Sequence, residues 1–456
     1  MGRNGAATPT ALFADLYELT MMQAYLSEGL TGEAVFSLFV RRLPGVRNYL
    51  IACGLDTLLD VLAAARFSPD DISYLASLNL FAPDFLDWLR RFRFTGDVYA
   101  VPEGTIVFAN EPIVEIVAPL PQAQLFETIV MNQIHLQTLL ASKAARMVTA
   151  ARGRRVVDFG ARRMHGTDAA IKAARAFHIA GVAATSNLAA GRRYAIPVAG
   201  TMGHSYVQAH ETEAEAFRAF ARIYPDTVLL IDTYDTVAAA KRVVELAARH
   251  RDEFRISAVR LDSGDLGVLS RAVRGLLDAA GLRQVRIMAS GGLDETMIER
   301  LVSGGAPIDS FGIGTSMGVS ADMPGLDIAY KLTEYGGKGR LKLSAGKPIL
   351  PGRKQVFRRE EVGMYSGDEI ARSNETRPGA PLLACVMRNG RKLAHPAEPL
   401  SAMRERARDG LARLPKSIVS LAPADPPYPV AISAALASYD LEVRREIARK
   451  QQAETG

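Results

Sequence analysis

The chain has 456 residues, of which 48% are hydrophobic and 23% charged, a composition typical of a globular protein with roughly two or three domains. Its two cysteines, Cys53 and Cys385, form neither a disulfide framework nor a metal-type cluster, so we expect a cytoplasmic protein. The net charge of +6 suits anionic small molecules or nucleic acid and decides nothing alone. Residues 1–20 do not resemble a signal peptide, and no apolar run approaches the ~18 residues of a membrane span, so we expect no membrane association.

The first 125 residues have a mixed pattern of helices and strands. Residues 10–30 look helical, the alternating segment 34–44 predicts a strand, and helical patterns dominate residues 48–93. Residues 97–120 alternate apolar and polar side chains, with Pro and Gly between them, which predicts short antiparallel strands. We therefore expect an α+β domain over residues 1–125.

The pattern changes near residue 126, where a long helix leads into short apolar runs that alternate with helices. Strand, turn and helix in this order are typical of a parallel α/β sheet. An α/β barrel over residues 126–332 fits seven such runs better than a doubly wound sheet, which stays an alternative. The candidate strands lie in residues 154–163, 181–187, 196–200, 227–236, 256–265, 285–292 and 307–315.

Residues 333–456 contain further strand-like segments and a basic helical region. We expect this segment to fold back on the first domain and to end in a helical tail. The basic stretch 403–416 could bind nucleic acid, but it has no interleaved aromatic residues, so a solvated helix face is the better interpretation.

Almost every candidate strand of the barrel region is followed by polar or glycine residues. In a parallel α/β barrel the loops after the strands carry the chemistry. These residues are Arg162, Arg163, His165, Ser186, Asn187, His204, Asp232, Asp235, Arg260, Asp262, Asp265, Gly291, Gly292, Gly312, Gly314 and Thr315.

Two glycine turns follow the last two strands, where barrels commonly bind phosphate. Their backbone N–H groups can approach phosphate oxygens closely, although glycines that simply form tight turns are the alternative. Asp262 and Asp265 could hold Mg²⁺ through water or the diol of a ribose, and Asp265 could instead cap a helix. Arg162 suits a carboxylate or a phosphate, unless it is only a solvated charge.

His204 follows the short apolar segment "PVAG" and has small neighbours. A loop histidine without a function is the simplest interpretation of this residue alone. The seven histidines lack the H-x-x-x-H spacing of zinc hydrolases. From the residues alone we predict a barrel enzyme that binds a phosphorylated sugar and uses an arginine for an anionic group.

Eight segments in chain order resemble the nicotinate phosphoribosyltransferase family. They run from about residue 12 to residue 358: "ADLYELTMMQAY", "FVRRLP", "DFGARRMHGTDAA", "AATSNLAAG", "GTMGHSYVQAH", "RLDSGDL", "SFGIGTSMG" and "KLSAGKPILPGRKQVFR". The resemblance implies a type II phosphoribosyltransferase fold, an α/β sandwich domain plus an irregular barrel, in a homodimer with shared active sites. It also implies that nicotinate and 5-phosphoribosyl 1-diphosphate give nicotinate mononucleotide and diphosphate, with ATP as co-substrate and Mg²⁺ as cofactor.

The same resemblance assigns roles to residues around the base. His204 would carry a transient phosphoryl group from ATP and would be oriented by Asp232. Tyr17, supplied by the partner subunit, and Phe159 would stack on the two faces of the pyridine ring. Arg162 would pair with the nicotinate carboxylate.

Further roles concern the sugar and its phosphates. Asp262 and Gly291 would hold the ribose, while Gly292 and Arg260 would also bind substrate. The 5-phosphate would lie on the last turn, at Gly312, Gly314 and Thr315. We expect no direct protein ligand for Mg²⁺, which would be held by the diphosphate and by Asp262 or Asp265 through water.

Three alternatives remain at this point. A nicotinamide-using relative would have an aspartate where Ser186 and Asn187 stand, and these neutral residues suit an acidic substrate better. A quinolinate-using enzyme would need further basic residues, and a non-catalytic binding protein would not need His204. One departure is Gly203, where the resemblance leads us to expect Ala; this glycine slightly loosens the backbone next to His204.

Overall fold

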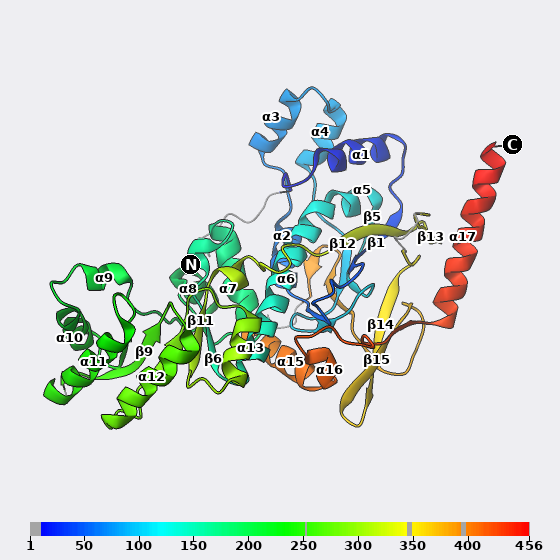
Figure 1. Ribbon diagram of the computed structural model, residues 1–456. Coiled ribbons are helices and arrows are strands. Elements are labelled where there is room, and N and C mark those ends of the chain that lie inside the picture. Colours follow the sequence, from blue (N-terminus) through cyan, green and yellow to red (C-terminus); the bar gives the residue numbers. More distant parts are fainter. Residues whose placement is uncertain (1–10, 251–252, 344–348, 394–397, 456) are drawn as a thin grey trace. The chain divides into compact units, whose positions relative to one another are not determined.

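The computed structural model describes residues 11–250, 253–343, 349–393 and 398–455 (Figure 1). Part of the motif at 342–358 therefore lies outside the described residues. The chain forms two compact units. One contains the residues up to Leu139 together with those from Gly325 onward, and the other runs from Leu140 to Pro324.

The unit from Leu140 to Pro324 is built on a six-stranded parallel sheet. Its curled half-barrel confirms the predicted α/β barrel class. Val198 in the third predicted strand forms only an isolated bridge with Thr185, because Pro197 beside it cannot donate a ladder hydrogen bond. In sheet order the strands are β7 (Ala184–Thr185), β6 (Arg155–Asp158), β11 (Ser310–Ile313), β10 (Arg286–Ala289), β9 (Ile256–Leu261) and β8 (Thr227–Leu230).

Helices follow most of these strands, as the alternating sequence pattern predicts. In α12 the buried residues Leu266, Ser270, Val273 and Leu277 recur at helical spacing, and the helix contacts β9 and β10. Asp265 caps α12, because its Oδ1 accepts a hydrogen bond of 3.0 Å from the Val268 N–H. The helices are α6 (Glu127–Ala151), which begins in the other unit, α7 (Thr167–Ile179), α8 (Leu188–Tyr194), α9 (His204–Gln208), α10 (Glu213–Ile223), α11 (Thr236–His250), α12 (Leu266–Ala279), α13 (Glu295–Ser303) and α14 (Thr315–Gly318), with the 3₁₀ turn η1 (Ala161–Arg163).

The other unit contains a seven-stranded antiparallel sheet. The strands β12 and β17 from the C-terminal part pair with β1 and β3, which confirms that this part folds back on the N-terminal domain. In sheet order the strands are β13 (Lys338–Gly339), β12 (Ile328–Tyr335), β1 (Glu33–Val40), β5 (Pro112–Pro119), β3 (Asp97–Ala100), β17 (Ala384–Arg388) and β18 (Arg391–Lys392).

Two smaller sheets and eight helices complete the described part of this unit. The sheets are β16 (Ala380–Pro381), β14 (Lys354–Glu361), β15 (Met364–Arg372) and β19 (Val430–Ile432), and the pair β2 (Leu50–Ile51) and β4 (Ile106–Val107). The helices are α1 (Leu16–Ser27), α2 (Leu55–Ala64), α3 (Pro69–Ser77), α4 (Pro83–Arg90), α5 (Leu120–Leu125), α15 (Leu400–Ala412), α16 (Lys416–Val419) and α17 (Ala434–Thr455).

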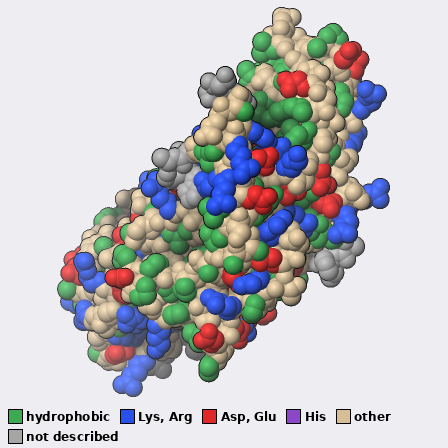
Figure 2. All heavy atoms as spheres, turned by 90° about the vertical axis from the view of Figure 1, so that its right-hand side faces the viewer, with side chains coloured by type: hydrophobic (Ala, Val, Ile, Leu, Met, Phe, Trp, Pro, Cys, Tyr) green, Lys and Arg blue, Asp and Glu red, His purple; other side chains and the backbone are tan. Residues whose placement is uncertain are grey.

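The basic stretch 403–416 forms most of α15, and its charged residues share the helix with an apolar face. Met403, Ala407 and Gly410 are buried on that face. On the face of the molecule in Figure 2, Lys and Arg side chains are interspersed with Asp and Glu. Within the described residues, no helix is long and apolar enough to span a membrane.

A buried ion pair joins the C-terminal strands to the N-terminal domain. The Arg358 guanidinium in β14 contacts the Asp368 carboxylate in β15 at 2.5 Å, and both side chains are at most 4% exposed. The same guanidinium donates to the Ile106 carbonyl at 2.8 Å, and the Tyr428 hydroxyl donates to Asp368 at 3.0 Å. These directional contacts fix how the C-terminal segment packs on β4.

The first helix, α1, is held by a buried carboxyl group. Glu18 is fully buried, and its Oε1 accepts hydrogen bonds of 2.7 Å from both the N–H and the hydroxyl of Thr128. Burial, together with the nearby carboxylates of Glu127 and Asp15, outweighs these bonds and raises the pKa of Glu18 to about 7.

The unfolding free energy therefore depends on the charge of Glu18. Because its pKa is about 7 in the folded chain and ordinary near 4.5 in the unfolded chain, the folded state binds more protons between these values. We expect stability to fall as the pH rises from about 4.5 to about 7, by at most ~1.4 kcal/mol per pH unit from this group. Denaturant unfolding at several pH values measures this slope.

The variant Glu18→Gln keeps an acceptor for Thr128 and cannot titrate, so its slope should be shallower than that of the wild type. Glu28→Gln at the exposed end of the same helix is the matched control and should leave the slope unchanged. Equal slopes for the wild type and Glu18→Gln would contradict the assignment.

Candidate active site

The predicted site residues of the half-barrel gather at one edge of the parallel sheet. Each of its strands runs in the same direction, so their carboxyl ends meet there. Phe159 follows β6, Ser186 follows β7, Asp232 follows β8 and Asp262 follows β9. Gly291 and Gly292 come after β10, and Gly312, Gly314 and Thr315 lie at the end of β11 and the start of α14.

The ring of Phe159 lies between two of these strand ends. Its N–H donates to the Ile313 carbonyl at 2.8 Å, and its side chain is only 9% exposed. A Cβ atom at position 312 would come within 2.5 Å of the ring, so only a glycine there leaves room for Phe159. The guanidinium carbon of Arg260 lies 5.7 Å from the ring centroid.

Asp158 fixes the turn that carries this ring. Its carboxylate accepts hydrogen bonds from the Gly160 N–H at 2.8 Å and from the Thr185 hydroxyl at 2.7 Å. Burial raises the pKa of Asp158. Sequence reasoning misses this residue, because in the sequence it is simply the last residue of an apolar strand.

Asp262 is the centre of a connected polar group. Its Oδ1 accepts a hydrogen bond of 2.5 Å from the Ser290 hydroxyl, and its N–H donates to Asp232 Oδ2 at 3.1 Å. Asp232 Oδ2 also accepts from the Ser263 hydroxyl at 2.6 Å. These contacts bind the loops after β8, β9 and β10 to one another.

Gly291 is required at this centre by its close approach to the backbone. It has φ +84°, and a Cβ atom there would lie 1.7 Å from the carbonyl oxygen of Asp262. Gly292 has φ +62°, but nothing lies within 4 Å of a Cβ at that position. The first glycine is therefore dictated by packing and the second by the turn alone.

His204 is the first residue of α9, and a polar side chain lies near each of its ring nitrogens. Nδ1 lies 3.2 Å from the Thr233 hydroxyl, and Nε2 lies 3.8 Å from Asp262 Oδ2. The resemblance implies that Asp232 orients this ring, but in the structure the Asp232 carboxylate has other partners. The Asp232 carboxylate points at the Asp262–Ser263 backbone turn, and the side chain facing the imidazole is Asp262.

Two polar groups of the site carry unused hydrogen-bonding capacity. Asp232 Oδ1 and Arg260 Nε are both buried and have no hydrogen-bond partner among the described residues. Burial also lowers the pKa of Arg260, against the nearby charges of Asp262 and Asp232. Arginine remains protonated at neutral pH, so the Arg260 Nε–H is a buried donor without a partner among the described residues.

The remaining predicted residues lie outside the polar group around Asp262. Arg162, in η1, is exposed and donates to the Phe159 carbonyl at 3.3 Å; Arg163 and His165 are exposed nearby in the chain. Ser186 is exposed, and Asn187 caps α8 through the Ala190 N–H at 3.2 Å. Tyr17 lies in α1 of the other unit with 44% exposure, so its place in the site stays a prediction.

Comparisons with known proteins identify the family of this chain. The family model described as the nicotinate phosphoribosyltransferase N-terminal domain matches residues 12–135, and that of the nicotinate phosphoribosyltransferase family matches residues 154–358. A nicotinate phosphoribosyltransferase of Mycobacterium tuberculosis is 53% identical to this chain, over 98% of it and 95% of the relative. The chain belongs to the nicotinate phosphoribosyltransferase family.

Two further similarities support the same conclusion. A nicotinate phosphoribosyltransferase of Bacillus subtilis is 40% identical over 80% of this chain and 76% of its own. The crystal structure of human nicotinic acid phosphoribosyltransferase matches with a TM-score of 0.81 and 28% identity, covering 94% of this chain and 99% of the human one. The family resemblance carried by eight motifs is confirmed, and the activity is that of a nicotinate phosphoribosyltransferase in NAD biosynthesis.

Three hydroxyl-bearing residues at these strand ends escape sequence analysis. Thr233 and Ser290 carry the hydroxyls that contact His204 and Asp262, and Ser263 bonds to Asp232. A hydroxyl beside a glycine or an aspartate is too common in turns to be recognised alone. Their position near the carboxyl ends of three predicted strand segments is the one signal that could have found them.

Gly291→Ala tests the close packing at Asp262. The new Cβ would overlap the Asp262 carbonyl and require an unfavourable φ, so we expect a loss of about 2 kcal/mol or more in unfolding free energy. Displacement of Asp262 should also lower kcat/KM by roughly tenfold or more.

Gly292→Ala is the matched control, because it has the left-handed backbone without the clash. Its loss of unfolding free energy should be only about 1 kcal/mol, because the substitution adds backbone strain without a clash. Equal losses of unfolding free energy at the two glycines would show that backbone strain, and not the contact with Asp262, determines the effect of an added Cβ.

Proposed function

We propose that nicotinate binds against Phe159, with its carboxylate on Arg162. The phenyl ring is held on a rigid turn, and the exposed guanidinium of Arg162 is anchored to the carbonyl of the same residue. Ser186 and Asn187 at the end of β7 bring no negative charge that would repel a carboxylate. Stacking on Tyr17 from a partner subunit completes this proposal.

The ribose and its phosphates are proposed to occupy the neighbouring strand ends. Asp262, Gly291 and Gly292 would hold the sugar, and Gly312, Gly314 and Thr315 would hold the 5-phosphate. Arg260 offers a buried N–H without a partner, which suits an oxygen of the diphosphate. The observation that carries this arrangement is the connected group around Asp262, since it unites three loops at one place.

The reaction then needs positioning more than acid–base chemistry. The bond from C1 of the ribose to the diphosphate oxygen breaks, and the lone pair of the pyridine nitrogen forms the new C1–N bond. Positive charge develops on the sugar as the leaving group departs. The carboxylate of Asp262 would stabilise that charge, and Phe159 would hold the ring nitrogen in line with C1.

Mg²⁺ fits the residues present, although the described residues contain no cluster of three or more His, Cys, Asp or Glu side chains that could hold a metal directly. Asp262 is half-buried, and Asp232 beside it has a buried oxygen without a partner. Asp265 fits less well because one of its oxygens caps α12. When bound with the diphosphate, Mg²⁺ would neutralise charge on the leaving group.

His204 is proposed to couple ATP hydrolysis to the reaction. Its Nδ1 is engaged by Thr233, which leaves Nε2 as the attacking nitrogen. The Nε2 lone pair would form a bond to the γ-phosphorus of ATP while the bond to the ADP oxygen breaks. Water would later release phosphate. A Cβ at position 203 would have Ser205 Oγ at 3.8 Å as its nearest neighbour, so Gly203 is not required by packing next to this ring.

A homodimer with shared sites is also proposed. Apolar side chains near the strand ends are unusually exposed: Leu188 is 73% and Tyr234 is 65% exposed. In the other unit, Tyr17 at 44% and Leu16 at 52% are exposed on the same helix. Coverage by a second copy would remove these apolar surfaces from water. The two free cysteines are consistent with the proposed cytoplasmic location.

Replacing His204 tests ATP coupling. We expect His204→Gln to form no acid-labile phosphoenzyme with γ-labelled ATP and to lose the stimulation of turnover by ATP. Basal turnover without ATP should persist, because the base and sugar contacts remain.

His210→Gln is the control, since this histidine bonds to the Tyr206 carbonyl on α9 and faces no carboxylate in the described contacts. Its labelling should equal that of the wild type. Full labelling of His204→Gln would refute the role of His204.

A further inference from the structure

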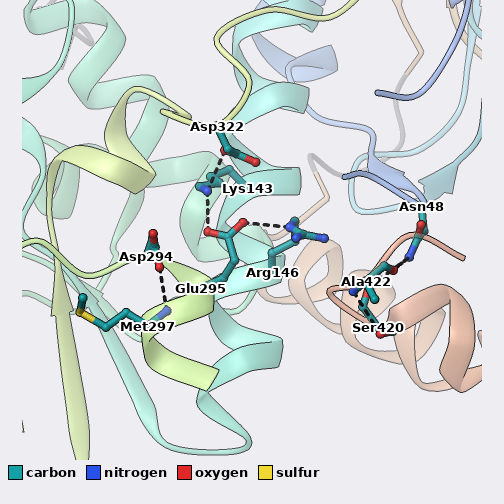
Figure 3. A network of polar contacts seen from close by, with 9 residues as sticks. All are labelled: Asn48, Lys143, Arg146, Asp294, Glu295, Met297, Asp322, Ser420 and Ala422. Carbon is teal, nitrogen blue, oxygen red and sulfur yellow. Dashed lines mark hydrogen bonds and ion pairs between the residues drawn. The ribbon is translucent and has the colours of Figure 1, made fainter. Parts of the chain in front are cut away.

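A buried charged cluster joins α6 to the segments that follow the two glycine turns in the chain (Figure 3). Lys143, from α6, contacts Glu295 at 2.5 Å and Asp322 at 2.7 Å through its Nζ, and Arg146 donates to the other oxygen of Glu295 at 2.9 Å. The side chains of Lys143 and Glu295 are 2% and 5% exposed. Four charges are thus brought together inside one unit.

Such a cluster is a costly way to gain stability. Removing a lysine and a glutamate from water costs several kcal/mol per ion, and well-packed apolar side chains often stabilise a core as well or better. Burial alone would raise the pKa of Glu295, but Lys143 and Arg146 more than offset it, so the pKa is lowered and the carboxylate stays charged. A directional role explains the cluster better than stability does.

The acceptors of Lys143 belong to the two segments that carry the glycine turns. Glu295 is the first residue of α13, three positions after Gly292, and Asp294 beside it caps that helix through the Met297 N–H at 2.7 Å. Asp322 lies just beyond α14, which begins after Gly314. The Ser316 hydroxyl on α14 also donates to the Leu293 carbonyl.

We propose that Lys143 is a positioning residue that fixes the separation of the two glycine turns and thereby sets the affinity for the phosphoribosyl group. One ammonium group holds both segments, so their spacing is defined by two short, charge-assisted bonds. Turns held in the binding geometry lose less entropy when the sugar phosphate binds. This proposal rests on the proposed binding of ribose and 5-phosphate at these turns.

The proposal predicts different effects on the kinetic constants of the two substrates. Nicotinate is proposed to contact Phe159 and Arg162, which take no part in the cluster and touch only the second glycine turn, so the KM for nicotinate should depend on Lys143 much less than the KM for the phosphoribosyl diphosphate substrate. A purely structural role would lower stability and affect both substrates alike. Ribose 5-phosphate is the sharpest probe, because it carries the sugar and the 5-phosphate without the diphosphate.

Asp322→Asn is the main variant. Its side chain is 27% exposed, and Lys143 keeps Glu295, so the change should fold. We expect the inhibition constant for ribose 5-phosphate and the KM for the phosphoribosyl diphosphate substrate to rise by roughly tenfold. The KM for nicotinate should stay within about twofold, and Asp322→Glu should restore part of the affinity. Lys143→Met should likewise raise the constants for ribose 5-phosphate and the phosphoribosyl diphosphate substrate more than the KM for nicotinate, and it should lower the Tm.

Asp278→Asn is the matched control, because it also removes a partly exposed carboxylate from an ion pair of 2.9 Å in the same unit, with Arg274. It should change none of these constants. Thr315→Val tests the proposed 5-phosphate site at the second glycine turn. This variant should raise the inhibition constant for ribose 5-phosphate.

Suppose that Thr315→Val raises the inhibition constant for ribose 5-phosphate and Asp322→Asn does not. The positioning role of Lys143 is then wrong, whereas binding of the 5-phosphate at the turn of Gly312, Gly314 and Thr315 is supported. If neither variant changes that constant, the 5-phosphate does not bind at this turn and the proposal fails with that assignment. If Asp322→Asn raises both substrate constants equally, the cluster has only a structural role.

Discussion

The close contact between Asp262 and Gly291 is the constraint on which the site depends. The carbonyl of Asp262 occupies the space where any other residue at position 291 would have a Cβ atom. This contact brings the end of β9 directly against the turn after β10, where Ser290 bonds to the Asp262 carboxylate. The N–H of Asp262 bonds in turn to Asp232 after β8, and its second carboxylate oxygen faces His204. One residue therefore connects three strand ends and the proposed phosphorylated histidine.

The parallel sheet supplies the other half of this arrangement. Each strand contributes one or two groups at its carboxyl end, and the sheet fixes their spacing without further cost in flexible loops. Glycine at position 312 admits the Phe159 ring between neighbouring strand ends, as glycine at position 291 admits Asp262. The buried Lys143 contacts Glu295 and Asp322, which follow the last two turns in the chain, and is proposed to hold these turns in place. A reaction controlled by positioning requires such rigid support for the groups at the strand ends.

Sequence analysis predicts the features that depend on local pattern. Alternation of strand and helix, the strand-end residues, the Asp265 cap and the family itself are all readable from short segments. It does not predict which groups pair across loops: the family resemblance places Asp232 against His204, whereas the Asp232 carboxylate is engaged by the Asp262 N–H and the Ser263 hydroxyl. Such choices depend on the register of neighbouring strands and on one close carbonyl, which no single segment encodes. Lys143 looks like part of an ordinary helix for the same reason, since its acceptors lie more than 150 positions away in the chain.

The most direct test of this account compares Asp262→Asn with the wild type in turnover of nicotinate and the phosphoribosyl diphosphate substrate. Asparagine keeps the shape of the side chain and an acceptor for Ser290, so the Tm should change by only a few degrees. The account predicts that kcat/KM for the phosphoribosyl diphosphate falls by about a hundredfold, because the charge proposed to face the sugar is lost. An Asp262→Asn enzyme that folds and works within about threefold of the wild type would contradict it.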